Sequence, residues 1–150
     1  MIIAPQIVFY GNCSEAVNFY KKIFNLSDVN IVTFGDVQSI LNIGIAEKDR
    51  NLIYSAELYF STEFGISSFL LSDSISIIFD DSLNRNKNIK NNISIEISDI
   101  DKERIKVLYN KLAKEGKINT KLKSSVYSEL HGSIIDKYGI CWNFYYGKKF

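Results

Sequence analysis

Apolar residues recur in the first part of the chain at two different spacings. Residues 4–10 form a mostly apolar run that predicts a strand, and Gly11 with Asn12 predicts a turn. In the next segment apolar residues recur three and four positions apart, as on one face of an α-helix. Asn12 and Glu15 have the spacing of a capping box at the start of that helix. We therefore expect a helix of about three turns, packed on a sheet through Ala16, Phe19, Tyr20, Ile23 and Phe24.

Three β-rich runs follow, separated by turns or loops. Between the first two, residues 36–51 have an ambiguous pattern that could hold a short helix. Residues 74–79 extend the third run. The predicted strands are residues 29–34, 52–60 and 66–73.

A polar segment rich in Asn and Lys, residues 81–92, then interrupts the apolar pattern. After it, residues 92–98 alternate as a strand, and residues 99–117 form an amphipathic helix that begins near Asp99 or Asp101 and is closed by Gly116. The apolar stripe of this helix is Ile105, Leu108 and Leu112. Three more β-like runs are residues 118–125, 130–136 and 141–146.

Both halves thus contain a strand, a helix and about three further strands. A half of this kind cannot bury its sheet alone, so the repeat predicts two βαβββ modules packed as one domain over residues 1–150. The modules are residues 1–80 and 91–150, with a linker at 81–90, and the fold class is α+β.

Composition narrows the function classes. The 18 basic and 17 acidic residues leave a formal charge of +1, which gives no electrostatic reason to expect a nucleic-acid partner. No apolar run approaches the roughly 20 residues that span a bilayer. The first residues lack a basic region and a cleavage site, so we expect a cytoplasmic protein without a membrane partner. The eight glycines form no GxG, which excludes a dinucleotide fingerprint.

Few residues offer nucleophilic or metal-binding chemistry. Cys13 and Cys141 lie far apart without a CxxC pattern, so we expect buried thiols rather than a disulfide or a nucleophile. His131 is the only histidine, which excludes a metal site built on a His pair. We expect it at a strand edge or turn, with a role as a hydrogen-bond donor to a ligand as the alternative.

Several motifs in order along the chain resemble one family. They are FYGNCSEAVNFYKKIF at residues 9–24, SAELYF at 55–60 with FLLSDS at 69–74, and LYNKLAKEGK at 108–117 with HGSIIDKYGICWNF at 131–144. This pattern resembles the PhnB-like branch of the vicinal oxygen chelate superfamily, which contains the glyoxalase, bleomycin-resistance and extradiol dioxygenase folds. One departure is Tyr127 and Ser128, where the family usually has Trp-Gly.

The resemblance implies a cup-shaped, eight-stranded mixed sheet made from the two modules, with helices outside and a ligand cleft within. It also implies a homodimer. In metal-dependent relatives four strand residues point into the cleft, and the matching positions here are Pro5, Glu57, Asn92 and Asn143, with Ser94 as the alternative to Asn92. Only Glu57 among these is an ionisable ligand. Divalent metals prefer several carboxylates or imidazoles, so we expect no tightly bound metal cofactor.

Strand alternation supports a cleft position for some of these residues. In residues 92–98 the isoleucines share one face, while Asn92, Ser94 and Glu96 share the other. In residues 141–146, Asn143 and Tyr145 oppose the large apolar side chains in the same way. Phe9, Tyr127 and Tyr145 are candidates for aromatic walls of the cleft, and core packing is the alternative for each.

Three hypotheses remain open from the sequence. The first is a metal-free small-molecule binder with a cleft lined by Glu57, Asn92, Asn143, Tyr145 and His131. The second is a divalent-metal-dependent lyase, transferase or dioxygenase in which Glu57 anchors the ion and Glu96 supplies a missing ligand. Its carboxylates would then lie within about 5 Å of each other. The third is a protein–protein module with a filled cleft. Glu57 and Glu96 are the only candidates for a catalytic role, and a solvated strand position is the preferred interpretation of Glu96.

Overall fold

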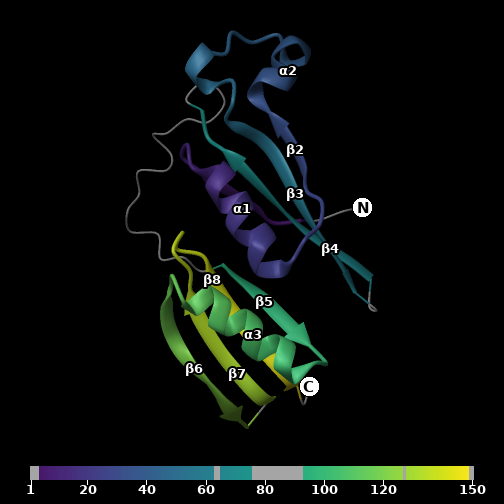
Figure 1. Cartoon of the computed structure of the whole chain (residues 1–150), viewed down its shortest axis with the longest axis vertical. Coiled ribbons are helices and arrows are strands. Elements are labelled where there is room, and N and C mark those ends of the chain that lie inside the picture. Colours follow the sequence, from purple (N-terminus) through teal and green to yellow (C-terminus); the bar gives the residue numbers. More distant parts are fainter. Residues whose placement is uncertain (1–3, 63–64, 76–92, 127, 149–150) are drawn as a thin grey trace. The chain divides into compact units, whose positions relative to one another are not determined.

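The computed structural model describes residues 4–62, 65–75, 93–126 and 128–148 (Figure 1). The chain divides into two compact units, Met1–Arg85 and Asn86–Phe150, which we call the first and the second unit. Each unit contains one four-stranded mixed sheet. The linker predicted at residues 81–90 lies outside the described residues.

The first unit has a sheet with strand order β1-β4-β3-β2. Strand β1 pairs parallel with β4, and the other neighbours pair antiparallel. Its elements are β1 (Gln6–Phe9), α1 (Cys13–Phe24), β2 (Asn30–Thr33), α2 (Phe34–Leu41), a 3₁₀ turn (Glu47–Asp49), β3 (Ile53–Thr62) and β4 (Gly65–Asp73).

The second unit repeats this topology. Its sheet has the order β5-β8-β7-β6, and its first strand again pairs parallel with its last. The elements are β5 (Ser94–Asp99), α3 (Lys102–Ala113), β6 (Lys117–Ser125), β7 (Ser128–Ile135) and β8 (Cys141–Lys148). The predicted α+β class and the repeated βαβββ order are therefore confirmed.

Helix α2 accounts for the segment whose pattern was ambiguous. It begins one residue after Thr33, whose hydroxyl accepts a hydrogen bond from the Asp36 amide, while the Asp36 carboxylate accepts from the Thr33 amide. This reciprocal capping box satisfies amides that the first turn would otherwise leave unpaired. Phe34 is buried beneath the helix with Ile45 and Ile75. A small apolar cluster thus holds α2 to the first unit.

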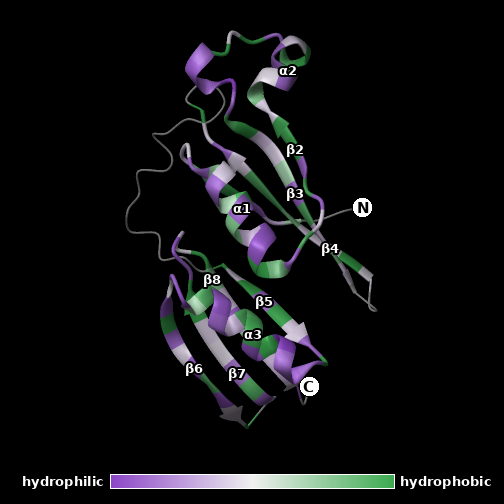
Figure 2. Cartoon of the chain, in the orientation of Figure 1, coloured by the Kyte–Doolittle hydropathy of each residue, from purple (hydrophilic) through white to green (hydrophobic). Residues whose placement is uncertain are grey.

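Helix α1 packs on its sheet through buried aliphatic residues and through aromatic side chains, of which Tyr20 is buried while Phe19 and Phe24 are half-buried. Tyr20 is fully buried and meets Phe69 edge to face, with ring centroids 5.9 Å apart. Phe24 meets Phe60 in the same way at 5.2 Å. Such edge-to-face pairs add to the hydrophobic stabilisation of burial. Figure 2 shows hydrophobic and hydrophilic residues in turn along the helices, as one-sided packing requires.

Helix α3 packs on the second sheet through a stripe that differs by one residue from the prediction. Ile105 and Leu112 are fully buried as expected, but Tyr109 is buried between them and Leu108 is only half-buried. The Tyr109 hydroxyl donates to the Thr120 carbonyl at 3.0 Å, so its polar end is satisfied. A Cβ atom at Gly132 would lie 3.0 Å from the Tyr109 ring, so the glycine leaves room for it.

The start of α3 is as predicted from the sequence, whereas its end is not. Asp101 is the N-cap and accepts hydrogen bonds from the amides of Glu103 and Arg104, as predicted. The helix ends at Ala113 with a right-handed cap residue, so Gly116 does not end it through a left-handed turn. A Cβ atom at Gly116 would instead lie 2.5 Å from the Ile135 carbonyl oxygen. Glycine is required there because two backbones approach closely.

The capping box predicted for α1 does not form. Asn12 is the N-cap residue, but its side chain accepts no helix amide. The buried carboxylate of Asp73, at the end of β4, accepts from the amides of Gly11 and Cys13 through Oδ1 and from the Ile53 amide through Oδ2, at 2.9–3.0 Å. A charged acceptor at the helix N-terminus also interacts favourably with the helix dipole. A residue about sixty positions away thus replaces the local cap.

Asp136 has a similar role in the second unit. Its carboxylate is buried and accepts from the amides of Tyr138 and Ile140 and from the indole N–H of Trp142. Gly139 closes the turn with a φ of +84°, a conformation that glycine adopts without steric cost. The Asp-x-x-Gly sequence before β8 is therefore a turn whose carboxylate also fixes the buried tryptophan.

Both cysteines are free thiols, as predicted, but only Cys13 is buried as expected. Cys13 is fully buried, and Cys141 is half-buried. Burial, reinforced by the nearby Asp73 charge, raises the pKa of the Cys13 thiol to about 12. Cys13 therefore stays protonated near neutral pH and is a poor nucleophile.

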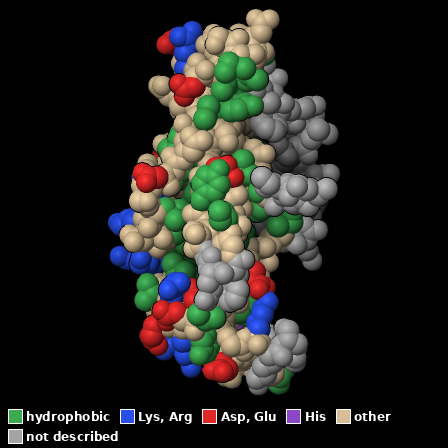
Figure 3. Space-filling view, turned by 90° about the vertical axis from the view of Figure 1, so that its right-hand side faces the viewer, with side chains coloured by type: hydrophobic (Ala, Val, Ile, Leu, Met, Phe, Trp, Pro, Cys, Tyr) green, Lys and Arg blue, Asp and Glu red, His purple; other side chains and the backbone are tan. Residues whose placement is uncertain are grey.

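Charged side chains of both signs are mixed on the face of the molecule shown in Figure 3. No large area of that face carries charges of one sign only. Among the residues that the structure describes, no helix is both long and apolar enough to cross a membrane.

Replacing Asp73 by Asn should destabilise the protein by about 2–4 kcal/mol, because one oxygen becomes an NH₂ group facing buried backbone donors. Urea unfolding followed by far-UV circular dichroism measures this loss. Asp28→Asn, which alters an exposed carboxylate in the loop after α1, is the matched control. Equal stability of the two variants would contradict the assigned role of Asp73.

In the folded protein, iodoacetamide at pH 8 should label Cys141 well before Cys13, because Cys13 is buried and its thiol has the raised pKa. Timed labelling and peptide mass spectrometry give the two rates. Labelling in urea provides the control, where both cysteines should react. Equal native rates would show that Cys13 is accessible as a thiolate.

Candidate functional site

In the first unit, Glu57 lies on the sheet face opposite α1. Its neighbours in the strand, Ala56 and Leu58, are fully buried on the side that α1 covers. Strand register aligns Glu57 with Leu70 of β4 and Asn30 of β2, and Leu70 with Gln6 of β1. Because paired residues point to the same face, these four side chains form one row across the sheet.

The Glu57 carboxylate accepts two hydrogen bonds from its own sheet. The Tyr59 hydroxyl donates to Oε2 at 2.5 Å, and the Ser68 hydroxyl donates to Oε1 at 3.0 Å. Tyr59 lies two residues along β3, directly across from Ser68. The hydrogen bond to Glu57 raises the pKa of the Tyr59 phenol. The Glu57 side chain is half-buried, whereas Tyr59 is 49% exposed. Solvent therefore reaches this hydrogen-bonded pair from the side of the Tyr59 ring.

On the first strand, Gln6 rather than Pro5 lies in the row with Glu57. Pro5 precedes β1, and its carbonyl accepts a hydrogen bond from the Leu70 amide. The Gln6 amide donates to the buried Ser72 hydroxyl at 2.9 Å. Sequence reasoning missed Gln6, although its alternation with Ile7 was a usable signal.

The second sheet presents its predicted polar residues opposite α3. Glu96 is aligned with Asn143, and Asn143 with Ser133 on the next strand. The neighbouring Trp142 and Phe144 are buried, and Phe144 contacts Tyr109 of α3. The Asn143 amide donates to the Ser94 hydroxyl at 2.7 Å.

Tyr145 is the centre of an aromatic and charged cluster on the same sheet. The expectation of His131 at a strand edge or turn is wrong, because it lies within the inner strand β7 and is paired with Lys123 and Tyr145. Its ring stacks on Tyr145, with centroids 4.7 Å apart and planes 21° from parallel. The ammonium of Lys148 lies 4.4 Å from the Tyr145 ring centroid and 2.5 Å from the Glu96 carboxylate. Lys148 was missed from the sequence. Its approach depends on Gly147, whose φ of +60° interrupts regular strand geometry.

The structure divides the predicted site between the units. Glu57 belongs to the first, and Glu96, Asn143, Tyr145 and His131 belong to the second. Asn92 and Tyr127 lie outside the described residues. Phe9 is 5% exposed and pairs with Asp73, so it belongs to the core rather than to a cleft wall.

The donor set fits a divalent metal poorly. Of the matching positions, Pro5 has no donor side chain and Asn92 lies outside the described residues. The first unit then offers the Glu57 carboxylate, and the second offers only the Asn143 amide and the alternative Ser94 hydroxyl, hence a single negative charge. In the described part of the chain, no three His, Cys, Asp or Glu side chains are grouped to hold an ion. First-row metals prefer richer sets of imidazole, thiolate or carboxylate ligands.

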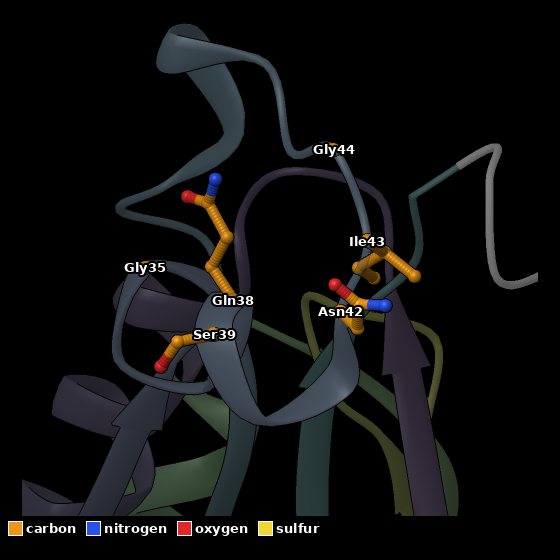
Figure 4. Close-up of a pocket in the computed structure, with 6 residues that line it drawn as sticks. All are labelled: Gly35, Gln38, Ser39, Asn42, Ile43 and Gly44. Carbon is orange, nitrogen blue, oxygen red and sulfur yellow. The ribbon is translucent and has the colours of Figure 1, made fainter.

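A separate open pocket of about 500 Å³ lies beside α2. Figure 4 shows Gln38, Asn42 and Ile43 at its edge, on the helix and the loop after it. Its lining contains no titratable side chain and none of the predicted cleft residues. Its amide, hydroxyl and backbone groups include no acid or base that could activate the Ser39 hydroxyl.

Comparison with known proteins identifies the fold. Protein PA1353 from Pseudomonas aeruginosa has a TM-score of 0.75 at 22% identity, covering 98% of both chains. A protein from Bacillus cereus described as putative 3-demethylubiquinone-9 3-methyltransferase, PhnB protein, gives 0.65 at 23% identity, covering 98% of this chain and 100% of that one. A glyoxalase/bleomycin resistance protein/dioxygenase family enzyme from Burkholderia phytofirmans gives 0.59 at 10% identity over 94% of both chains.

Sequence comparison agrees with these structural similarities. The family model described as 3-demethylubiquinone-9 3-methyltransferase matches residues 2–145, almost the whole chain. The match includes both buried aspartates, Asp73 and Asp136, together with Glu57, Asn143 and Tyr145, and it ends before Lys148. The chain therefore belongs to this PhnB-like family of glyoxalase-fold proteins.

Proposed function

We propose that this protein binds a small organic molecule on the polar faces of its sheets and does so without a tightly bound divalent metal. The main support for the proposal is the hydrogen bonding of the Glu57 carboxylate. Its two oxygens are each engaged by a hydroxyl donor of the same sheet, so the carboxylate is held as a recognition group. No second carboxylate of the first unit shares its row.

The character of the sheet faces supports a small ligand. In each unit a helix covers one face of the sheet (Figure 1). The opposite face carries amide, hydroxyl and aromatic side chains, such as Asn30, Ser68 and Tyr59 in the first unit and Asn143, Ser133 and Tyr145 in the second. Small-molecule sites typically combine apolar or aromatic surface with a few fixed polar groups. The stacked rings of His131 and Tyr145 provide flat surface, and the amide of Asn143 provides a polar contact.

The proposal assigns no catalytic acid, base or nucleophile. Glu96 is engaged by Lys148, and Cys13 is a buried thiol with a raised pKa. The proposed location is the cytoplasm, and the proposed ligand is an organic molecule rather than a nucleic acid or a membrane.

Elemental analysis of protein purified without a tag or chelator tests the metal-free part of the proposal. We expect less than one tenth of an equivalent of Zn, Mn, Ni or Fe in the wild type and in Glu57→Gln alike. Native mass spectrometry of the same sample tests for an organic molecule that copurifies.

Glu15→Gln is the matched control, because Glu15 is an exposed carboxylate on α1. One equivalent of metal in the wild type and in this control, absent from Glu57→Gln, would reject the proposal. That result would favour the metal-dependent enzyme class instead.

We also propose that the protein is a homodimer, as is common among related folds. Light scattering at micromolar concentration should give twice the monomer mass. A monomer mass across that range would contradict the dimer but would leave the ligand proposal to its own test.

A further inference from the structure

Glu57 is a half-buried carboxylate whose observed partners are neutral. Only the hydroxyls of Tyr59 and Ser68 donate to it, and no ion pair in the described part of the chain includes it. Removing a carboxylate from water is costly unless a cation or several donors compensate. An ionised carboxylate has about four acceptor sites, so two hydroxyl bonds leave further capacity on each oxygen.

The second unit contains the same chemical pair together with a cation. There the Glu96 carboxylate and the Tyr145 ring both contact the ammonium of Lys148, at 2.5 Å and 4.4 Å. The ammonium thus combines a charge-assisted hydrogen bond with a cation–π contact. The chain shows by its own contacts how a carboxylate and a tyrosine on one sheet hold a primary amine.

The first unit offers a comparable pair. Glu57 and Tyr59 lie two residues apart on β3, so both side chains project from the same face. The Tyr59 ring is 49% exposed, which leaves its surface accessible to a cation. The amide of Asn30, next to Glu57 in the row, adds a neutral acceptor for an N–H group.

We propose that Glu57 and Tyr59 form a recognition site for the primary ammonium group of a small molecule. The inference rests on the proposed small-molecule function and adds the chemical class of the ligand. An anion would face the uncompensated Glu57 charge. A divalent metal would find one carboxylate and no other charged ligand in the row. An alkylammonium needs only one carboxylate and one aromatic ring.

The test uses n-butylammonium, which resembles the end of a lysine side chain, and the neutral analogue 1-butanol. Both are titrated into the full chain labelled with ¹⁵N, in low salt, and the backbone amide shifts are followed by NMR. We expect n-butylammonium, but not 1-butanol, to shift the amides from Glu57 to Tyr59 and that of Ser68. Raising the ionic strength should weaken the effect.

Two variants with matched controls locate the contact. Glu57→Gln should raise the dissociation constant for n-butylammonium at least tenfold, and Tyr59→Leu should raise it about fivefold. Glu15→Gln and Tyr10→Leu, which alter an exposed carboxylate and a tyrosine that is 62% exposed, should change it less than twofold. Far-UV circular dichroism checks that each variant is folded.

The outcomes separate this inference from the proposed function. The ammonium site would be overturned if 1-butanol shifted the backbone amides as much as n-butylammonium does, or if neither compound shifted them. It would also be overturned if Glu57→Gln left the dissociation constant for n-butylammonium unchanged. If elemental analysis still finds no metal and an organic molecule copurifies, the proposed function survives that failure. A stoichiometric metal lost in Glu57→Gln would overturn both.

Discussion

The carboxylate of Asp73 joins three segments of the first unit, and the geometry of the sheet depends on it. One oxygen accepts from the amides that precede and begin α1, and the other accepts from the first residue of β3. A buried charge is tolerated only when donors surround it, so these segments cannot separate without exposing an unpaired carboxylate. Because β3 carries Glu57 and Tyr59, the same interaction fixes the start of the strand that presents the candidate site. Asp136 acts similarly before β8, which carries Asn143 and Tyr145.

Local patterns predicted much of the fold because the relevant physics is local. The spacing of Ala16, Tyr20 and Ile23 identified the buried face of α1, and the alternation around Glu96 identified a strand. The α1 cap was predicted wrongly because its acceptor, Asp73, comes from the far end of the same unit. A sequence pattern around Asn12 contains no information about a carboxylate that only strand pairing brings near.

The candidate site was predictable to a smaller degree. The face of Asn143 followed from alternation, and the choice of Glu57 as a candidate followed from family resemblance. The contact of Tyr59 with Glu57 has a sequence signal, since residues two apart share a strand face. The contact of Lys148 with Glu96 has none, because it joins β8 to a strand about fifty residues earlier and depends on the unusual backbone of Gly147. The sequence alone does not show whether a carboxylate such as Glu57 or Glu96 has a cationic side chain of the same chain beside it.

The indole of Trp142 has a practical consequence for studying how the units unfold. It is the only tryptophan in the chain, it is 1% exposed, and its N–H is bound to the buried Asp136 carboxylate. Its emission therefore reports the environment of the second unit alone, whereas far-UV circular dichroism reports the backbone of both. Coincident transitions in the two signals would indicate that the halves unfold as one cooperative unit, and separated transitions would reveal an intermediate with one half intact. The single fluorophore thus allows the coupling between the repeated halves to be measured without adding a label.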